Sequence, residues 1–221
     1  MALALALAAG NVSTSALLSD AEADSAAAVT ASDFAATRYY LHDDPTPPSS
    51  DQASQAGLAM DGTAPVATRL FDYDTDHGAA PGRTIARGGS GPAETDLTRY
   101  QDWRGPTVVV PQTVSGTVVV ELWTAMAGFE AGRAGDLRVH LRDRDTVLGT
   151  TTEIATAAVS AADWQGAVSG WVKRRADIVV AGHTLVVGHQ LELKVTVPAA
   201  SGGDLWLAYD TTLYRSRVTL P

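Results

Sequence analysis

The feature that most constrains the fold is a strict two-residue alternation of apolar and polar side chains. Leu137, Val139 and Leu141 are apolar, and the residues between them are arginine and histidine. Residues 191–197, LELKVTV, repeat the pattern. Successive side chains of a strand point to opposite faces, so this period predicts strands with one buried and one solvated face.

Similar short runs, rich in β-branched residues and broken by Gly, Pro and Asp, fill the chain after residue 64, where no run of helical period competes. The predicted strands are 66–71, 107–110, 113–126, 137–142, 154–159, 171–180, 185–187, 191–197, 205–209 and 218–220. Many short strands at fairly regular spacing are typical of an antiparallel sandwich. We therefore predict an all-β fold, a jelly-roll-like β-sandwich over residues 64–221.

The amino terminus has a different character. Residues 1–10, MALALALAAG, form an apolar run that is too short to span a bilayer. The run is typical of the core of an export signal, and the small residues Ser13 and Ser15 suit cleavage before Ala16. We predict a signal segment over residues 1–15, although the basic stretch that normally precedes such a core is missing. The alternative is an Ala/Leu helix packed on the domain.

The sequence that follows, ALLSD at 16–20 and YYL at 39–41, resembles the start of the TasA/camelysin group of exported bacterial proteins. Leu17 and Leu18 stand where that group usually has an aromatic residue. The resemblance covers about forty residues and implies a bacterial protein that is secreted or held at the cell surface. We expect residues 16–63 to form an extended segment followed by a Pro/Ser-rich loop, since Pro45, Pro47 and Pro48 prevent a regular helix.

The predicted sandwich resembles the galactose-binding-like jelly-roll modules of secreted bacterial enzymes. The matching stretches are GTVVVELW at 116–123, GDLRVHL at 135–141, HTLVVGHQLELKV at 183–195 and DLWLAYD at 204–210. The resemblance spans residues 65–221 and consists of a strand pattern and one hairpin. It therefore implies a non-catalytic module and speaks to fold more than to function.

Composition narrows the set of partners. The formal net charge is −9 and the sequence pI is about 4.9. Nucleic acid and anionic membranes repel such a surface, so we expect neither as a partner after signal removal. The chain has no cysteine, which excludes disulfides and thiolate chemistry.

One acidic stretch suggests a metal site. Asp72, Asp74 and Asp76 alternate in DYDTDHG, and carboxylates at alternate positions can converge on a hard cation such as calcium. The glycine falls one place later than in an EF-hand loop, and no glutamate closes the site. A solvated turn explains the same residues, since Asp supports turn geometry.

Tryptophan supplies the candidate ligand-binding residues. Three tryptophans lie near Gly or Asp in predicted loops, where an exposed indole can stack on a sugar ring: Trp103, Trp164 and Trp171. The other two, Trp123 and Trp206, lie in apolar strands and are expected in the core. Core anchoring is an alternative for all five. Asp210 joins the candidates because YDT at 209–211 echoes YDT at 73–75, although coincidence in a Thr- and Asp-rich chain is the simpler explanation.

Catalytic motifs are missing. Residues 83–91, RTIARGGSG, lack the lysine of a phosphate-binding loop. The five histidines show no helical metal-binding spacing, and no GxSxG motif occurs. His140 falls on the polar face of its predicted strand, so we expect it to be exposed. We predict that the protein is not an enzyme.

Two functions fit these observations best, and a secreted hydrolase of unrecognised type, which would need a pocket with two carboxylates or a metal, is a third alternative. The first is a cell-surface or extracellular-matrix structural module that associates with itself or with other surface proteins, using residues 16–40 as an added strand. The second is a carbohydrate-binding module that recognises polysaccharide, with calcium at Asp72, Asp74 and Asp76 as its candidate cofactor.

Overall fold

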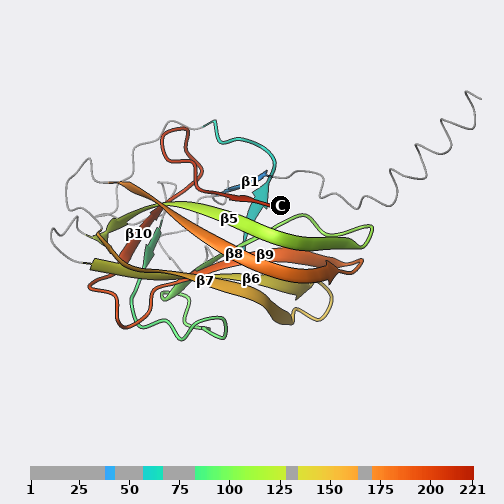
Figure 1. Cartoon of the computed structure of the whole chain (residues 1–221), viewed down its shortest axis with the longest axis horizontal. Helices are drawn as coiled ribbons and strands as arrows, with labels where there is room; N and C mark the ends of the chain where they lie inside the picture. The colour runs from blue at the N-terminus through green and yellow to red at the C-terminus, as the bar shows by residue number, and fades with distance from the viewer. Residues whose placement is uncertain (1–37, 43–56, 67–82, 128–133, 164–170) are drawn as a thin grey trace, which may run out of the picture. The chain divides into compact units, whose positions relative to one another are not determined.

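The structure, a computed structural model, describes residues 38–42, 57–66, 83–127, 134–163 and 171–221. These residues fall within one compact unit, Phe34–Pro221. The described residues form the eleven strands β1 (Arg38–Leu41), β2 (Leu58–Asp61), β3 (Arg83–Ile85), β4 (Tyr100–Arg104), β5 (Gln112–Met126), β6 (Ala134–Asp145), β7 (Thr151–Asp163), β8 (Val172–Leu185), β9 (His189–Thr196), β10 (Leu205–Ala208) and β11 (Arg217–Thr219). The predicted all-β, antiparallel sandwich is confirmed (Figure 1).

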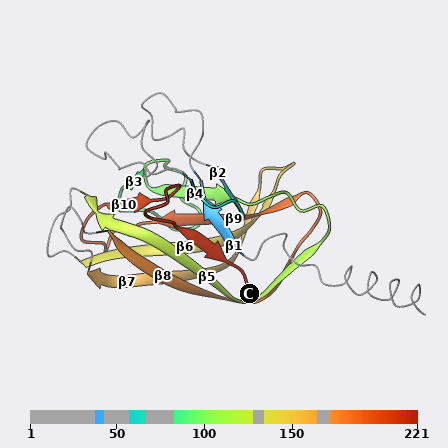
Figure 2. The same cartoon turned by 90° about the horizontal axis from the view of Figure 1, so that it is seen from above.

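The strands form two layers around a common core (Figure 2). In the first layer β5 pairs with β8 along one edge and with β10 and β11 along the other, and β3 continues from β10. In the second layer the order is β7, β6, β9, β4. Strand β1 pairs with β11, and β2 then connects β1 to β4, where it makes the one parallel pairing among the named strands. The two layers are thus joined by hydrogen bonds.

The longest pairing of the first layer runs from Gln112 opposite Leu185 to Thr124 opposite Val172. Its apolar alternation is as predicted: Val118, Val120 and Leu122 point inward and are almost wholly buried. From the second layer, Leu137, Val139 and Leu141 of β6 meet them in the same core. Burying such side chains is the main stabilising term of the fold.

Three strands, β2, β3 and β4, lie where the sequence predicted none, and β1 lies at the end of the predicted extended segment. Strands β1 and β2 pair with strands of the sandwich although they precede residue 64. Each missed strand has five residues or fewer, which is too short to display a period. Residues 107–110 and residues 186–187 of the predicted strand 185–187 lie in loops.

Several predictions fall outside the described residues. They are the signal segment 1–15, the extended stretch up to residue 37, and the loop that carries Asp72, Asp74 and Asp76. In the portion of the chain that is described, no helix has the length and apolarity needed to cross a bilayer.

Candidate functional site

A cluster of aromatic side chains lies on the outer face of the first layer. It consists of Trp123 on β5, Trp206 on β10, Trp171 just before β8, and Tyr214 in the loop between β10 and β11. We call these four residues the aromatic face. Trp206 is 6% exposed and packs with Trp171, whereas Trp123, Trp171 and Tyr214 are partly exposed.

Strand register places these residues together. Trp123 directly follows the inward-pointing Leu122, so it points to the opposite side of β5. Trp206 stands opposite Ala125 in the β10–β5 pairing, and thus shares this outer side. Val172 pairs with Thr124, which brings the neighbouring Trp171 to the same end of the layer.

Tyr214 lies between two indoles. Its ring centroid is 5.2 Å from that of Trp123, with planes inclined by 58°, and 5.4 Å from that of Trp171, with planes inclined by 36°. Both separations are within the 4.5–7 Å range of favourable aromatic pairs. The three rings therefore form a contiguous group, which we call the aromatic row, in which Tyr214 contacts both indoles.

The loop that carries Tyr214 is fixed to the sheet by a buried serine. The Ser216 hydroxyl donates a hydrogen bond to the Ala208 carbonyl at 2.5 Å and accepts one from the Trp123 backbone N–H at 2.9 Å. The Leu41 N–H also donates to the Ser216 carbonyl at 3.2 Å. These bonds join the loop to β10, β5 and β1, so the position of Tyr214 is set before any ligand arrives.

Charged residues flank the aromatic row on the same side of the sheet. Glu121, two residues before Trp123, lies 2.8 Å from the Lys173 ammonium and accepts a hydrogen bond from Arg217. Partial burial raises the pKa of the Glu121 carboxyl, but the bonds from Lys173 and Arg217 outweigh it and hold that pKa below its ordinary value. The face thus offers stacking surfaces beside fixed hydrogen-bonding groups.

The predicted ligand-binding tryptophans have different outcomes. Trp171 is part of the aromatic face. Trp103 is completely buried, packs edge-on against Tyr209 at 5.0 Å, and donates its indole N–H to the His42 carbonyl at 3.2 Å. It belongs to the core, so its predicted place on a binding surface is wrong. Trp164 lies outside the described residues.

Three residues of the aromatic face were not among the predicted binding residues, and one of them, Trp206, is buried as expected. Trp123 was expected in the core but points outward, which the alternation of Val118, Val120 and Leu122 already indicates. Tyr214 lies in a loop between two short strands, where the sequence gives no periodic signal. Only the fold brings it to Trp123.

The remaining predicted ligand residue, Asp210, belongs to a separate polar cluster. His42 lies between two carboxylates, with Nδ1 3.0 Å from Asp210 and Nε2 3.1 Å from Asp61. The hydrogen bond to Asp210 is the largest cause of a raised His42 pKa, which burial opposes and Asp61 supports. Asp210 itself has a positive φ of 53°, a strained conformation for a residue with a side chain. This cluster links β1, β2 and the loop after β10.

A second polar cluster, which contains two histidines, lies at the end of the sandwich where β8 ends and β9 begins. His183 Nε2 and His189 Nδ1 each lie 2.7 Å from one oxygen of Asp143. These histidines are six residues apart in sequence and lack a recognised metal-binding spacing. Within the described ranges, no group of three or more His, Asp or Glu side chains has an arrangement that would hold a metal ion.

His140 is buried rather than exposed, with 2% of its surface accessible. Its ring nitrogens contact Glu153 and Thr196 at 3.2 Å each. The loop between β3 and β4 covers this outer face of the second layer: Gly89 donates to the Val197 carbonyl, and the Lys194 ammonium donates to the Pro92 carbonyl. The alternation of β6 correctly predicts which side chains point to the core and which point to the outer face. A loop distant in sequence then buries the outer, polar side chains.

Comparison with known proteins adds information on the fold. No family model matches the chain, and no curated protein is similar to it. A solved α-amino acid ester hydrolase matches with a TM-score of 0.57 and 13% identity over 84% of this chain and 36% of that one. An aminopeptidase from the marine sediment archaeon Thaumarchaeota archaeon matches with a TM-score of 0.55 and 13% identity over 83% of this chain and 36% of that one.

The chain therefore spans about a third of the length of these two enzymes. At 13% identity the similarity shows a shared fold and nothing about activity. A CBM22-1 xylan-binding domain from Paenibacillus barcinonensis also matches, with 14% identity over 62% of this chain and 85% of that domain, but its TM-score of 0.28 is too low to argue from. The comparisons thus agree with the sandwich fold, and the function is argued from the geometry of the site.

Proposed function

We propose that the protein is a non-catalytic binding module that recognises polysaccharide through its aromatic face. The observation that carries the proposal is the row formed by Trp123, Tyr214 and Trp171, which is partly exposed on the outer side of one layer. The same proposal includes secretion to the cell exterior or surface, because a secreted protein meets polysaccharides there.

The chemistry of the row suits sugar rings. An aromatic ring presents a flat apolar surface with a negative face, against which the C–H groups of a pyranose can pack. Adjacent rings about 5 Å apart offer an extended stacking surface. The carboxylate of Glu121 and the ammonium of Lys173, fixed beside Trp123, supply hydrogen bonds for hydroxyl groups.

The test is a binding assay with a panel of soluble and insoluble polysaccharides. We expect at least one to bind the parent protein, and Trp171→Ala and Trp123→Ala each to weaken binding by about ten-fold or more, as removal of one stacked ring does. Val179→Ala is the matched control, since Val179 is 74% exposed on β8, away from the row. If no polysaccharide binds, or if Trp171→Ala binds as well as the parent, the proposal is wrong.

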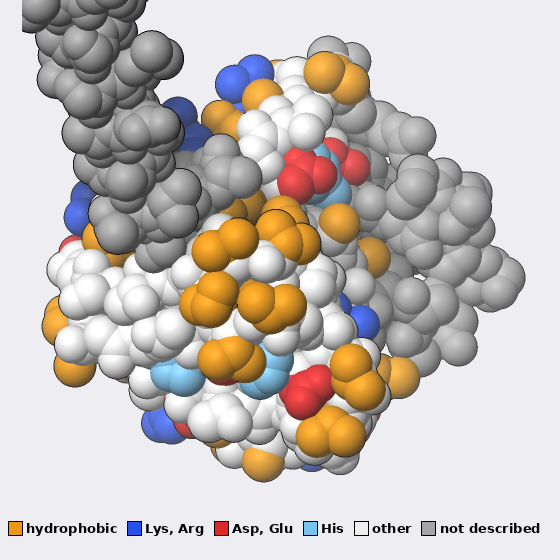
Figure 3. Space-filling model, turned by 90° about the vertical axis from the view of Figure 1, so that its right-hand side faces the viewer, with side chains coloured by type: hydrophobic (Ala, Val, Ile, Leu, Met, Phe, Trp, Pro, Cys, Tyr) orange, Lys and Arg blue, Asp and Glu red, His pale blue; other side chains and the backbone are white. Residues whose placement is uncertain are grey.

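A second candidate function is self-association, as expected of a structural module. It is favoured by six exposed aliphatic side chains at the end of the sandwich opposite the aromatic face. They are Val109, Val110, Val147, Leu148, Val186 and Val187, which are 48–86% exposed. Figure 3 views this end and shows hydrophobic side chains gathered at its centre. We call these six residues the aliphatic end.

Three loops form the aliphatic end, and hydrogen bonds join them. The Val108 N–H donates to the His189 carbonyl at 2.8 Å, the Gly188 N–H to the Val108 carbonyl at 2.9 Å, and the Thr146 N–H to the Gly188 carbonyl at 3.2 Å. A fixed apolar patch of this kind marks an interaction site more often than chance exposure does. A second copy presenting the same patch would bury it symmetrically.

Sedimentation velocity over a range of protein concentrations tests this candidate. We expect the parent to associate as concentration rises and Leu148→Asp to remain monomeric. Val179→Asp places the same charge on an exposed strand residue outside the aliphatic end and should associate like the parent. A parent that is monomeric at every concentration contradicts self-association but leaves polysaccharide binding unaffected. In the predicted strand addition by residues 16–40, residues 38–40 already pair within the sandwich as part of β1. Addition by the preceding residues would appear as association that survives Leu148→Asp.

A further inference from the structure

An apolar pocket of about 210 Å³ lies between the two layers, near the first residue of β5. Its walls include Tyr39 from β1, Met60 from β2, Leu191 from β9, and Pro106 and Val108 from the loop that precedes β5. Four of these five residues are 1–4% exposed, so the pocket is a recess in the core rather than a surface hollow. Val109 also lines it and is 79% exposed, which places the mouth at the solvent.

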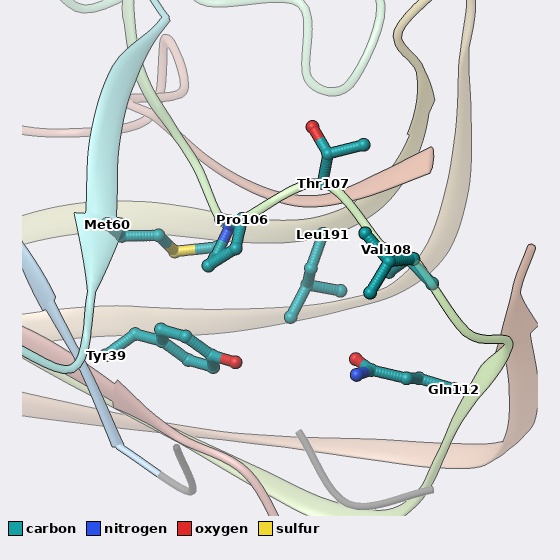
Figure 4. Close-up of a pocket in the computed structure, with 9 residues that line it drawn as sticks. Tyr39, Met60, Pro106, Thr107, Val108, Gln112 and Leu191 are labelled. Atoms are coloured by element: carbon teal, nitrogen blue, oxygen red, sulfur yellow. The ribbon is translucent and has the colours of Figure 1, made fainter. Parts of the chain in front are cut away.

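Two polar groups face each other across this apolar space. Figure 4 shows the Tyr39 hydroxyl and the Gln112 carboxamide pointing toward one another from opposite sides, whereas the Thr107 hydroxyl points away. Gln112 stands two residues before the buried Val114, so strand alternation turns it inward. A glutamine at an inward position is costly unless it has a partner for its amide.

We propose that this pocket binds a small uncharged aromatic ring that carries one hydroxyl group, that is, a phenol. An apolar cavity of about 150 Å³ holds benzene, so 210 Å³ accommodates a ring with one or two added heavy atoms. Met60, Val108 and Leu191 supply the apolar contacts. Tyr39 and Gln112 supply the hydrogen bonds that fix the hydroxyl group. A charged ligand is disfavoured because none of the described residues that line the pocket carries a charged side chain.

The site is separate from the aromatic face. Trp123 lies eleven residues along β5 from Gln112, which corresponds to roughly 36 Å of strand. Binding at the pocket therefore does not depend on polysaccharide binding, and either can fail without the other.

Calorimetric titration or NMR shift mapping of the full chain with phenol, p-cresol and benzene tests the proposal. For a ligand of seven heavy atoms we expect a Kd for phenol of about 0.1–1 mM. Benzene, which lacks the hydroxyl, should bind about ten-fold more weakly. N-acetyltyrosinamide carries the same ring on a peptide backbone. If it binds as tightly as p-cresol, the ring comes from a tyrosine of a partner; if only p-cresol binds, the ligand is a free small molecule.

Two variants separate the parts of the site. Val108→Phe fills the pocket and should abolish binding of all three rings, whereas Val179→Phe, outside both the lining and the aliphatic end, should bind like the parent. Gln112→Leu keeps the volume and removes the amide, so the preference for phenol over benzene should shrink toward one. If Val108→Phe fails to fold, the ratio of phenol to benzene affinity in Gln112→Leu still tests the proposal. The proposal is overturned if phenol and benzene bind the parent equally, if neither binds, or if folded Val108→Phe still binds phenol.

Discussion

The indole of Trp171 stacks on the phenol ring of Tyr214 with centroids 5.4 Å apart, although the two residues belong to segments more than forty positions apart. Trp123, from a third segment, contacts the same tyrosine. The aromatic face is therefore a product of strand register and of one fixed loop. Changes that release this loop should affect binding without touching an aromatic residue.

Ser216→Ala tests that relationship. The substitution removes the hydroxyl that donates a hydrogen bond to the Ala208 carbonyl and accepts one from the Trp123 N–H. Each of these two backbone groups then loses its hydrogen bond to Ser216. We expect a loss of about 1–3 kcal/mol in the free energy of unfolding, measured by urea denaturation, and weaker polysaccharide binding because Tyr214 is no longer held in place. Ser115→Ala, at an exposed position of β5, is the control and should change neither quantity. Unchanged binding in Ser216→Ala would show that Tyr214 needs no support from the loop.

Trp103→Phe separates core from binding surface. Trp103 fills the core against Tyr209 and donates to the His42 carbonyl, so the smaller ring should reduce the free energy of unfolding by about 1–3 kcal/mol. Where the variant is folded, its affinity for polysaccharide should equal that of the parent. Loss of affinity in a folded variant would place Trp103 in the binding surface after all.

Two histidines give opposite pH dependence. Burial lowers the pKa of His140 from 6.5, with Lys194 and Arg142 acting in the same sense and Glu153 opposing. The unfolded chain therefore binds this proton more readily, so the contribution of His140 to stability is complete above about pH 6.5 and declines as the pH falls. The stability difference between the parent and His140→Gln should decrease from pH 8 to pH 5 in urea denaturation.

His42 behaves in the reverse sense and serves as the matched comparison. Its pKa is raised from 6.5, chiefly by the hydrogen bond to Asp210. The stabilising contribution is present below about pH 6.5 and is lost as the pH rises through the folded-state pKa. The stability difference between the parent and His42→Gln should increase from pH 8 to pH 5. Two differences that both decrease from pH 8 to pH 5 would contradict the assignment of His42, and two that both increase would contradict that of His140.

Gly116→Ala tests the irregularity in β5, where the pairing with β8 shifts register between Val114 and Gly116. Gly116 has a φ of +114°, and a Cβ there would lie 3.1 Å from the Cβ of Pro221. A side chain is strained in that region of φ, so we expect a loss of about 1–3 kcal/mol in thermal or urea unfolding. Thr117→Ala, the next residue on the strand, is exposed and should lose less than 1 kcal/mol. A stability equal to that of the parent would mean that the strand shifts its register instead.

Local pattern determined much of this protein. The alternation at 137–142 and 191–197 sets which side chains of β6 and β9 face the core, and the β-branched run at 113–126 sets the length of β5 almost to the residue. A strand has a period of two wherever it occurs, so these properties follow from neighbours in the chain. The antiparallel sandwich was predictable for the same reason.

Contacts between distant segments decided the rest. Strands such as β1 and β4 are too short to show a period and are stabilised by pairing with β11 and β9. His140 is buried because the loop after β3 covers it, and Trp103 is buried because β1 and the end of β10 pack over it. The aromatic face and the pocket each combine at least three separate segments, because side chains meet by register and packing, which no local pattern encodes.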